Sequence, residues 1–293
     1  RRATCVANLK TKQDIFNLSA MRYADCSLED LLRKRFGILS NQVDDISLKK
    51  AGFSSVKDVI NHTKDYRRVI DILNLLSKKI LNNAKIERDN YLEYLNHEGL
   101  NSNELRQGVA IVDIGYNGSP QFNISQLIKN KEINGFYLLT FPDAIYSRSN
   151  GLKMEGFMCN YECFDSTVRA KMASLILFIE SSLCCSEGSL VKFSKNNNKL
   201  SPEYCYSNNE GERKDMVTKV HEGITEFNTI ICKLFSSEIK NISFNHQMID
   251  EAFYKALMKF EDKCLFKNID LEDNFKVYKT RSLVSKNKNI KTN

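Results

Sequence analysis

The chain of 293 residues has no tryptophan, and it holds only three prolines and 12 glycines. With so little proline, no proline-rich linker divides the chain. The longest apolar run, residues 173–179, is far shorter than the roughly 20 residues that a membrane-spanning helix needs. A site for single-stranded nucleic acid combines basic residues with interleaved aromatic residues, and no basic run in this sequence has that pattern. The sequence therefore predicts no membrane span and no nucleic-acid partner.

Cysteine is plentiful, but its spacing predicts no metal site. The nine cysteines include no C-x-x-C pair, and no H-x-x-x-H sequence follows Cys159 and Cys163. His221 and Glu222 lack the second histidine of a zinc protease, because Thr225 stands in its place. Free thiols in this number are typical of a reducing compartment, so we predict a cytoplasmic protein with no evident metal or cofactor.

The net charge of +7 is spread along the chain except at its end, where residues 281–293 carry basic side chains and no acid. We interpret residues 266–293 as a flexible basic tail, and a basic arm for an anionic surface is the alternative.

At the other end the chain begins at Arg1 rather than Met. We therefore expect it to be a piece of a longer polypeptide whose amino-terminal part is missing.

Residues 12–107 have the pattern of a helical block. Ser27 is expected to cap a helix that Gly37 terminates, and Ser55 is expected to cap another over residues 56–64. Apolar residues at helical spacing predict a long helical stretch from residue 65 to residue 95. The opening segment "RRATCVANL" is interpreted as a strand or turn.

After this block the pattern changes. Residues 109–114 predict a buried strand, Ser119 and Pro120 predict a helix start, and residues 133–141 predict a second strand. A strand, a glycine turn, a helix and a strand make a β-α-β unit, which implies a parallel sheet. The remaining predicted elements are a strand at 155–161, a helix at 166–183, a strand and turn at 188–204, and helices at 210–240 and 246–263.

These elements predict the α/β class: a parallel sheet of Rossmann-like β-α-β units with a large helical N-terminal block and C-terminal helices. The helical block is expected over residues 1–107. The α/β core with the C-terminal helices is expected over residues 108–265, and the tail begins at residue 266.

The segment "DIGYNGSPQ" is the candidate ligand site, because ligands of open α/β sheets bind beyond the carboxyl ends of the strands. Its glycines allow a close approach of the backbone, and the free amides of the next helix favour an anion. Its aromatic ring offers a stacking face, and its two amide side chains offer hydrogen bonds. The candidate ligand-binding residues are Asp113, Gly115, Tyr116, Asn117, Gly118, Ser119 and Gln121.

The alternative for this segment is a tight strand-to-helix turn in which Asp113 caps the neighbouring amides. The segment is neither a Walker A loop nor a G-x-G-x-x-G fingerprint. Secondary candidates lie elsewhere: Arg1 and Arg2 as phosphate partners, and the polar residues Glu180, Glu187 and Ser189 after an apolar helix. A polar cluster in that position is usually a helix cap.

Three stretches in order, "RRATCVANL", "VAIVDIGYNGSPQ" and "IESSLCCSEGSLVKF", resemble the carboxyl-terminal portion of a bacterial family. Its members are HAD-superfamily-like proteins associated with lipopolysaccharide, capsule and other surface-polysaccharide biosynthesis, often linked to glycosyltransferases. The resemblance covers most of residues 1–230. Family members carry "SRRA" and "VDIGW-x-G-x-x-Q", so Tyr116 stands where tryptophan is usual.

The resemblance implies a hydrolase whose nucleophile lies in an Asp-x-Asp-x-Thr motif and whose site takes magnesium. That motif is absent from these 293 residues, and Gly115 stands at the position of the second acid after Asp113. The catalytic residues are therefore unassigned, and a magnesium site would need an upstream part to complete it.

The main hypothesis is a cytoplasmic domain of a HAD-like polysaccharide-biosynthesis protein that binds a sugar-phosphate or nucleotide-sugar at residues 113–121. One alternative is a glycosyltransferase domain that uses a nucleotide-sugar donor. Another is a non-catalytic module that docks a polysaccharide enzyme, such as a glycosyltransferase, through its helical block.

Overall fold

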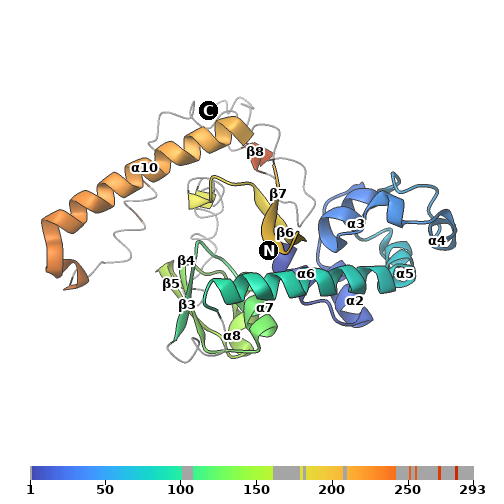
Figure 1. Ribbon diagram of the computed structural model, residues 1–293, viewed down its shortest axis with the longest axis horizontal. Helices are drawn as coiled ribbons and strands as arrows, with labels where there is room; N and C mark the ends of the chain where they lie inside the picture. The colour runs from blue at the N-terminus through green and yellow to red at the C-terminus, as the bar shows by residue number, and fades with distance from the viewer. Residues whose placement is uncertain are drawn as a thin grey trace, which may run out of the picture.

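The computed structural model describes residues 2–100, 108–160, 179–180, 183–206 and 210–241, with isolated positions at 251, 255, 270–271 and 281–282. It shows an α/β protein with a parallel three-stranded sheet, which confirms the predicted class. Figure 1 shows the helical block and the sheet at opposite ends of helix α6 (Ser77–His97). The predicted helix at 246–263 and most of that at 166–183 lie outside the described residues.

The helical block forms its own apolar core. Its remaining helices are α2 (Lys12–Ala20), α3 (Leu28–Phe36), α4 (Asp45–Lys50) and α5 (Tyr66–Leu75). The hydroxyl of Ser27 accepts a hydrogen bond from the Asp30 amide at 3.1 Å, and Gly37 ends α3 at φ 69°, as predicted. The predicted stretch from 65 to 95 is helical but is divided into α5 and α6 at Leu76.

The helix predicted at residues 56–64 is wrong. This segment forms turns and strand β2 (Val59–Ile60), which pairs antiparallel with β1 (Cys26–Ser27). The carbonyl of Asp58 accepts a bond from the Leu28 amide at 2.9 Å. Pairing with a distant part of the chain therefore overrides the local capping pattern at Ser55.

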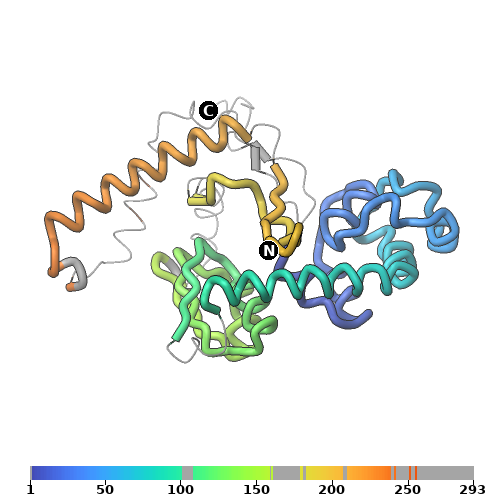
Figure 2. Tube along the Cα trace, viewed as in Figure 1, coloured from blue at the N-terminus to red at the C-terminus, as the bar shows by residue number. Residues whose placement is uncertain are grey.

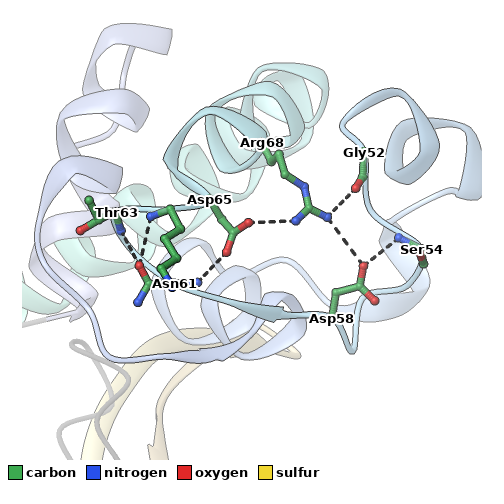
Figure 3. A network of polar contacts seen from close by, with 8 residues as sticks. Gly52, Ser54, Asp58, Asn61, Thr63, Asp65 and Arg68 are labelled. Carbon is green, nitrogen blue, oxygen red and sulfur yellow. Dashed lines mark hydrogen bonds and ion pairs between the residues drawn. The ribbon is translucent and has the colours of Figure 1, made fainter.

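Side chains from two acids hold these turns in place (Figure 3). The carboxylate of Asp58 accepts a bond from the Ser54 amide at 2.7 Å, and that of Asp65 accepts one from the Asn61 amide at 2.9 Å. Arg68 donates to Asp65 at 2.9 Å and also bonds the carbonyl of Gly52. These local bonds give the segment an alternative to helical backbone pairing.

The opening segment is helix α1 (Arg2–Ala7) rather than the predicted strand or turn. Arg2 is 5% exposed, and it donates to both carboxylate oxygens of Glu87 in α6, at 2.8 and 2.9 Å. The same guanidinium bonds the carbonyl of Val191. Packing against α6 and this ion pair stabilise a helix too short to form alone.

Strand β6 (Ser189–Asn196) and strand β7 (Lys199–Cys205) form an antiparallel hairpin, as the predicted strand and turn suggested. Figure 2 shows this hairpin running beside the N-terminal end of the chain. The carbonyl of Phe193 accepts a bond from Asn90 of α6 at 2.9 Å. Arg2, Glu87 and Asn90 thus tie the hairpin to the helical block across a long separation in the sequence.

The parallel sheet has the order β3 (Val109–Asp113), β4 (Ile133–Leu139), β5 (Lys153–Cys159). Helices α7 (Ser119–Ile128) and α8 (Ala144–Ser149) lie against one face, where Tyr137 and Met154 are buried. The other face is open, because Val112 is 83% exposed. The strand predicted at 109–114 is therefore confirmed as β3, but its predicted burial is wrong: β3 is an edge strand with one face in solvent.

After the hairpin the chain continues as α10 (Glu210–Phe235) and a 3-10 helix, η4 (Ser236–Asn241), which confirms the predicted helix at 210–240. A second 3-10 helix, η1 (Ser40–Gln42), lies in the helical block. Two short strands, β8 (Asp270–Leu271) and β9 (Arg281–Ser282), pair antiparallel within the predicted tail. Among the described residues, no helix is long and apolar enough to cross a membrane.

We predict that Glu87→Gln destabilises the protein by about 3–5 kcal/mol, because it leaves the buried guanidinium of Arg2 without a counter-charge. Urea unfolding followed by circular dichroism measures this loss. Arg33→Gln is the control, since Arg33 is paired with Asp30 on the surface and its loss should cost at most about 1 kcal/mol. Equal losses in the two variants would show that the Arg2–Glu87 pair does not hold α1 in place.

Candidate functional site

The loop that follows β3 lies along the carboxyl edge of the parallel sheet, as predicted. The amide of Leu139 bonds the carbonyl of Ile114 at 3.3 Å, and the amide of Phe141 bonds the carbonyl of Tyr116 at 2.8 Å. These two bonds fasten the loop to the end of β4. Gly115 is required here, because a Cβ atom would lie 2.5 Å from the Leu139 carbonyl oxygen.

Asp113 is the last residue of β3 and is paired in register with Tyr137. Burial raises the pKa of its carboxyl group, and bonds from the amides of Ile114 and Gly115 only partly oppose this shift. The predicted alternative, in which Asp113 caps neighbouring amides, therefore describes part of the geometry. Because Asp113 is half-buried, keeping its carboxylate ionised at neutral pH destabilises the protein despite these two bonds.

Two polar side-chain atoms of the loop are buried. The side-chain oxygen of Asn117 has no hydrogen-bond partner among the described residues. The hydroxyl of Tyr116 lies against the carboxylate of Glu180; burial raises the pKa of Tyr116, and the charge of Glu180 and a hydrogen bond to it raise this pKa further. The tyrosine hydroxyl therefore stays protonated, and Tyr116 and Glu180 form a polar pair beside the Asn117 oxygen.

Glu180 is the secondary candidate that the structure brings to the loop, through its approach to Tyr116. The ring of Tyr116 stacks on Phe141, with 4.7 Å between the ring centroids and 22° between the ring planes. One face of the predicted stacking ring is therefore already covered by the protein.

The start of α7 supplies backbone amides next to these groups. Gly118 is its N-cap at φ 67°, and the cap gives no side-chain bond to the first-turn amides. The helix therefore begins one residue earlier than predicted: Ser119, the predicted cap, is its first residue and Pro120 its second. Free amides at a helix start carry partial positive charge and favour an anion.

Gln121 lies outside the site. Its side chain is fully buried, donates to the carbonyls of Ile133 at 2.7 Å and Lys153 at 3.0 Å, and accepts from the Tyr137 hydroxyl at 2.8 Å. These bonds join α7 to the starts of β4 and β5. Gln121 therefore positions the sheet, and its side chain is not offered to a ligand at the carboxyl edge.

Three further polar residues lie at this edge and were not among the predicted site residues. Thr140, directly after β4, lies with its hydroxyl 3.2 Å from the side-chain oxygen of Asn160, which follows β5. The hydroxyl of Ser147 donates to the carbonyl of Asn117 at 2.9 Å. Thr140 and Asn160 are the next-to-last residues of the predicted strands 133–141 and 155–161, so the rule that located Asp113 also applies to them.

The other secondary candidates lie elsewhere. Arg1 lies outside the described residues, and Arg2 is engaged in the buried ion pair with Glu87. The carbonyl of Glu187 accepts a bond from Arg213 of α10 at 2.8 Å, and Ser189 opens the hairpin. No described contact joins Glu187 or Ser189 to the loop at 113–119.

Within the described ranges, no three histidine, cysteine or acidic side chains converge as a metal site would require. Comparison with known proteins adds no assignment: no family model matches this chain, and no curated protein matches it. The geometry of the carboxyl edge is therefore what any functional proposal has to rest on.

We predict that Asp113→Asn makes the protein more stable at neutral pH. The folded pKa of Asp113 is raised, so its favourable contribution is complete below the ordinary aspartate pKa and is lost as the pH rises through the folded value. The melting temperature of Asp113→Asn should exceed that of the wild type at pH 7. The difference should vanish as the pH falls toward about 4.

Asp65→Asn is the matched control with the opposite sign. The Asn61 amide and Arg68 hold the pKa of Asp65 below its ordinary value, so its stabilising contribution is present at neutral pH and is lost in acid. This variant should melt below the wild type at pH 7. A lower melting temperature for Asp113→Asn at pH 7 would mean that Asp113 is a stabilising cap and nothing more.

Proposed function

We propose that this chain is a domain of a HAD-like protein of surface-polysaccharide biosynthesis, and that it binds a sugar-phosphate or nucleotide-sugar at the loop of residues 113–119. The observation that carries the proposal is the unpartnered buried oxygen of Asn117, beside the carboxyl group of Asp113 and the contact of Tyr116 with Glu180. Buried polar groups without partners are rare in native proteins, and a ligand is one of their explanations.

The polar groups favour a ligand with both hydroxyl groups and a phosphate. Asp113 and the oxygen of Asn117 accept hydrogen bonds, as sugar hydroxyls require, and the oxygen of the Tyr116 hydroxyl can accept another. The first-turn amides of α7 suit a phosphate. A phosphate near Asp113 and Glu180 would meet two acids, so we place the phosphate at Ser119 and the sugar toward Asp113.

The Rossmann-like character of the β-α-β units belongs to this proposal. Helix α7 connects β3 to β4, and α8 connects β4 to β5, with all three strands parallel. In folds of that kind the carboxyl edge holds the phosphate of a nucleotide or sugar. We propose a cytoplasmic location for the domain because of its free thiols.

The proposal assigns binding rather than catalysis to this chain. A HAD nucleophile motif, Asp-x-Asp-x-Thr, is absent from the sequence, and a magnesium-dependent hydrolase site would need residues beyond those present here. A glycosyltransferase domain with a nucleotide-sugar donor is the second candidate, favoured by the same amides at the start of α7. A docking role for the helical block has no comparable observation in its favour.

We predict that Tyr116→Phe weakens the binding of the ligand about tenfold, because a hydrogen bond to the ligand is lost. The variant also removes the hydroxyl's bond to Glu180, so it should lower the stability of the free protein by no more than one hydrogen bond contributes, about 1 kcal/mol. Thermal shift and calorimetric titration with UDP-linked sugars, CMP-linked sugars and sugar 1-phosphates at millimolar concentration measure both effects.

Tyr23→Phe is the matched control, because the Tyr23 hydroxyl is also buried but lies in the helical block, away from the loop. It should change neither stability nor ligand response. Equal affinities of wild type and Tyr116→Phe, or the absence of any thermal shift in the wild type with all three ligand classes, would refute the proposed site.

A further inference from the structure

Helix α10 is anchored to the rest of the protein only at its start, and the part after Val217 carries exposed apolar side chains. Its first turns are anchored, because Arg213 is 6% exposed and donates to the carbonyls of Ser186 at 2.9 Å and Glu187 at 2.8 Å. Val217 is fully buried. After Val217 none of its residues is buried, and Figure 1 shows this part of the helix as an arm.

The apolar side chains of this arm recur with the alternating spacing of three and four residues that defines a heptad seam. Two of them are largely in solvent, since Phe227 is 62% exposed and Leu234 is 71% exposed. The seam, which we call the α10 seam, consists of Val217, Val220, Ile224, Phe227, Ile231 and Leu234.

The positions that flank the seam carry no formal charge. His221, Asn228 and Phe235 lie on one side of it, and Gly223 and Ile230 lie on the other. In two-stranded coiled coils these flanks usually hold charges that set partner choice and orientation. Their absence here removes like-charge repulsion between two copies of the same helix.

The exposed area is sufficient for a pair of copies. Ile224, Phe227, Ile230, Leu234 and Phe235 are between 37% and 71% exposed. An apolar side chain of this size presents roughly 200 Å² when fully open, so the five together offer about 500 Å² in each copy. Two copies would bury about 1,000 Å², which reaches the area that a specific interface needs.

We propose that α10 pairs with α10 of a second copy of this chain, seam against seam. A heptad seam fits a partner helix with the same spacing, because each side chain enters a hole between four residues of the facing helix. A second copy supplies that spacing by definition and gives a closed, two-fold contact. This dimer is independent of the proposed ligand site, which is built from β3, α7 and Glu180.

The test is the mass of the full chain in solution, by sedimentation equilibrium or light scattering between 1 and 100 µM. The wild type should have twice the monomer mass of 33.7 kDa. Phe227→Glu places a charge in the α10 seam and should raise the dissociation constant at least about 30-fold, as loss of a hot-spot residue does. Its melting temperature at monomeric concentrations and its ligand response should be those of the wild type.

Thr229→Glu is the control: it adds the same charge two residues away, on the opposite side of the helix, and should leave the dimer intact. A wild-type chain that is monomeric at 100 µM would overturn the proposal. A monomer whose melting temperature falls on Phe227→Glu would show that another part of the same chain covers the seam. A dimer that Phe227→Glu does not weaken would place the interface elsewhere and would also overturn it.

Discussion

The hydrogen bonds of the buried side-chain amide of Gln121 determine where the candidate site lies. Gln121 of α7 bonds the carbonyls at the starts of β4 and β5 and accepts from the hydroxyl of Tyr137. Because Tyr137 is paired with Asp113 in the parallel sheet, the same contacts fix α7 relative to the end of β3. The start of α7 and the carboxyl group of Asp113 are thereby held at one edge.

At that edge the protein keeps polar groups in states that do not favour its own stability. Asp113 is ionisable and partly buried, and the side-chain oxygen of Asn117 is buried without a partner. The Tyr23 hydroxyl and Nε of Arg2 are also buried without partners, but in the part of the chain that the structure describes no buried acid with a raised pKa lies beside them on a sheet edge. An unpartnered oxygen next to a buried carboxyl group at the carboxyl edge of a parallel sheet is the arrangement that a binding site requires.

Local signals in the sequence predicted the elements that local contacts determine. Ser27 and Gly37 bound α3 as their residue types suggest, and the glycine turn after β3 located the carboxyl edge. The exposure of Val112, the strand at 59–60 and the ion pair of Arg2 depend on residues far away in the chain. The local pattern at each position therefore predicted something else. It predicted a buried strand at 109–114, a helix at 56–64 and a phosphate partner at Arg2.

The most direct test of the central claim, a ligand held between Asp113 and the start of α7, is a nuclear magnetic resonance titration. The backbone amides of Gly118 and Ser119 and the side-chain amide of Asn117 would be followed during addition of a UDP-linked sugar. We expect saturable shifts confined to these groups and to neighbours at the carboxyl edge. Saturable shifts that cluster elsewhere while these three amides stay unchanged would contradict the account.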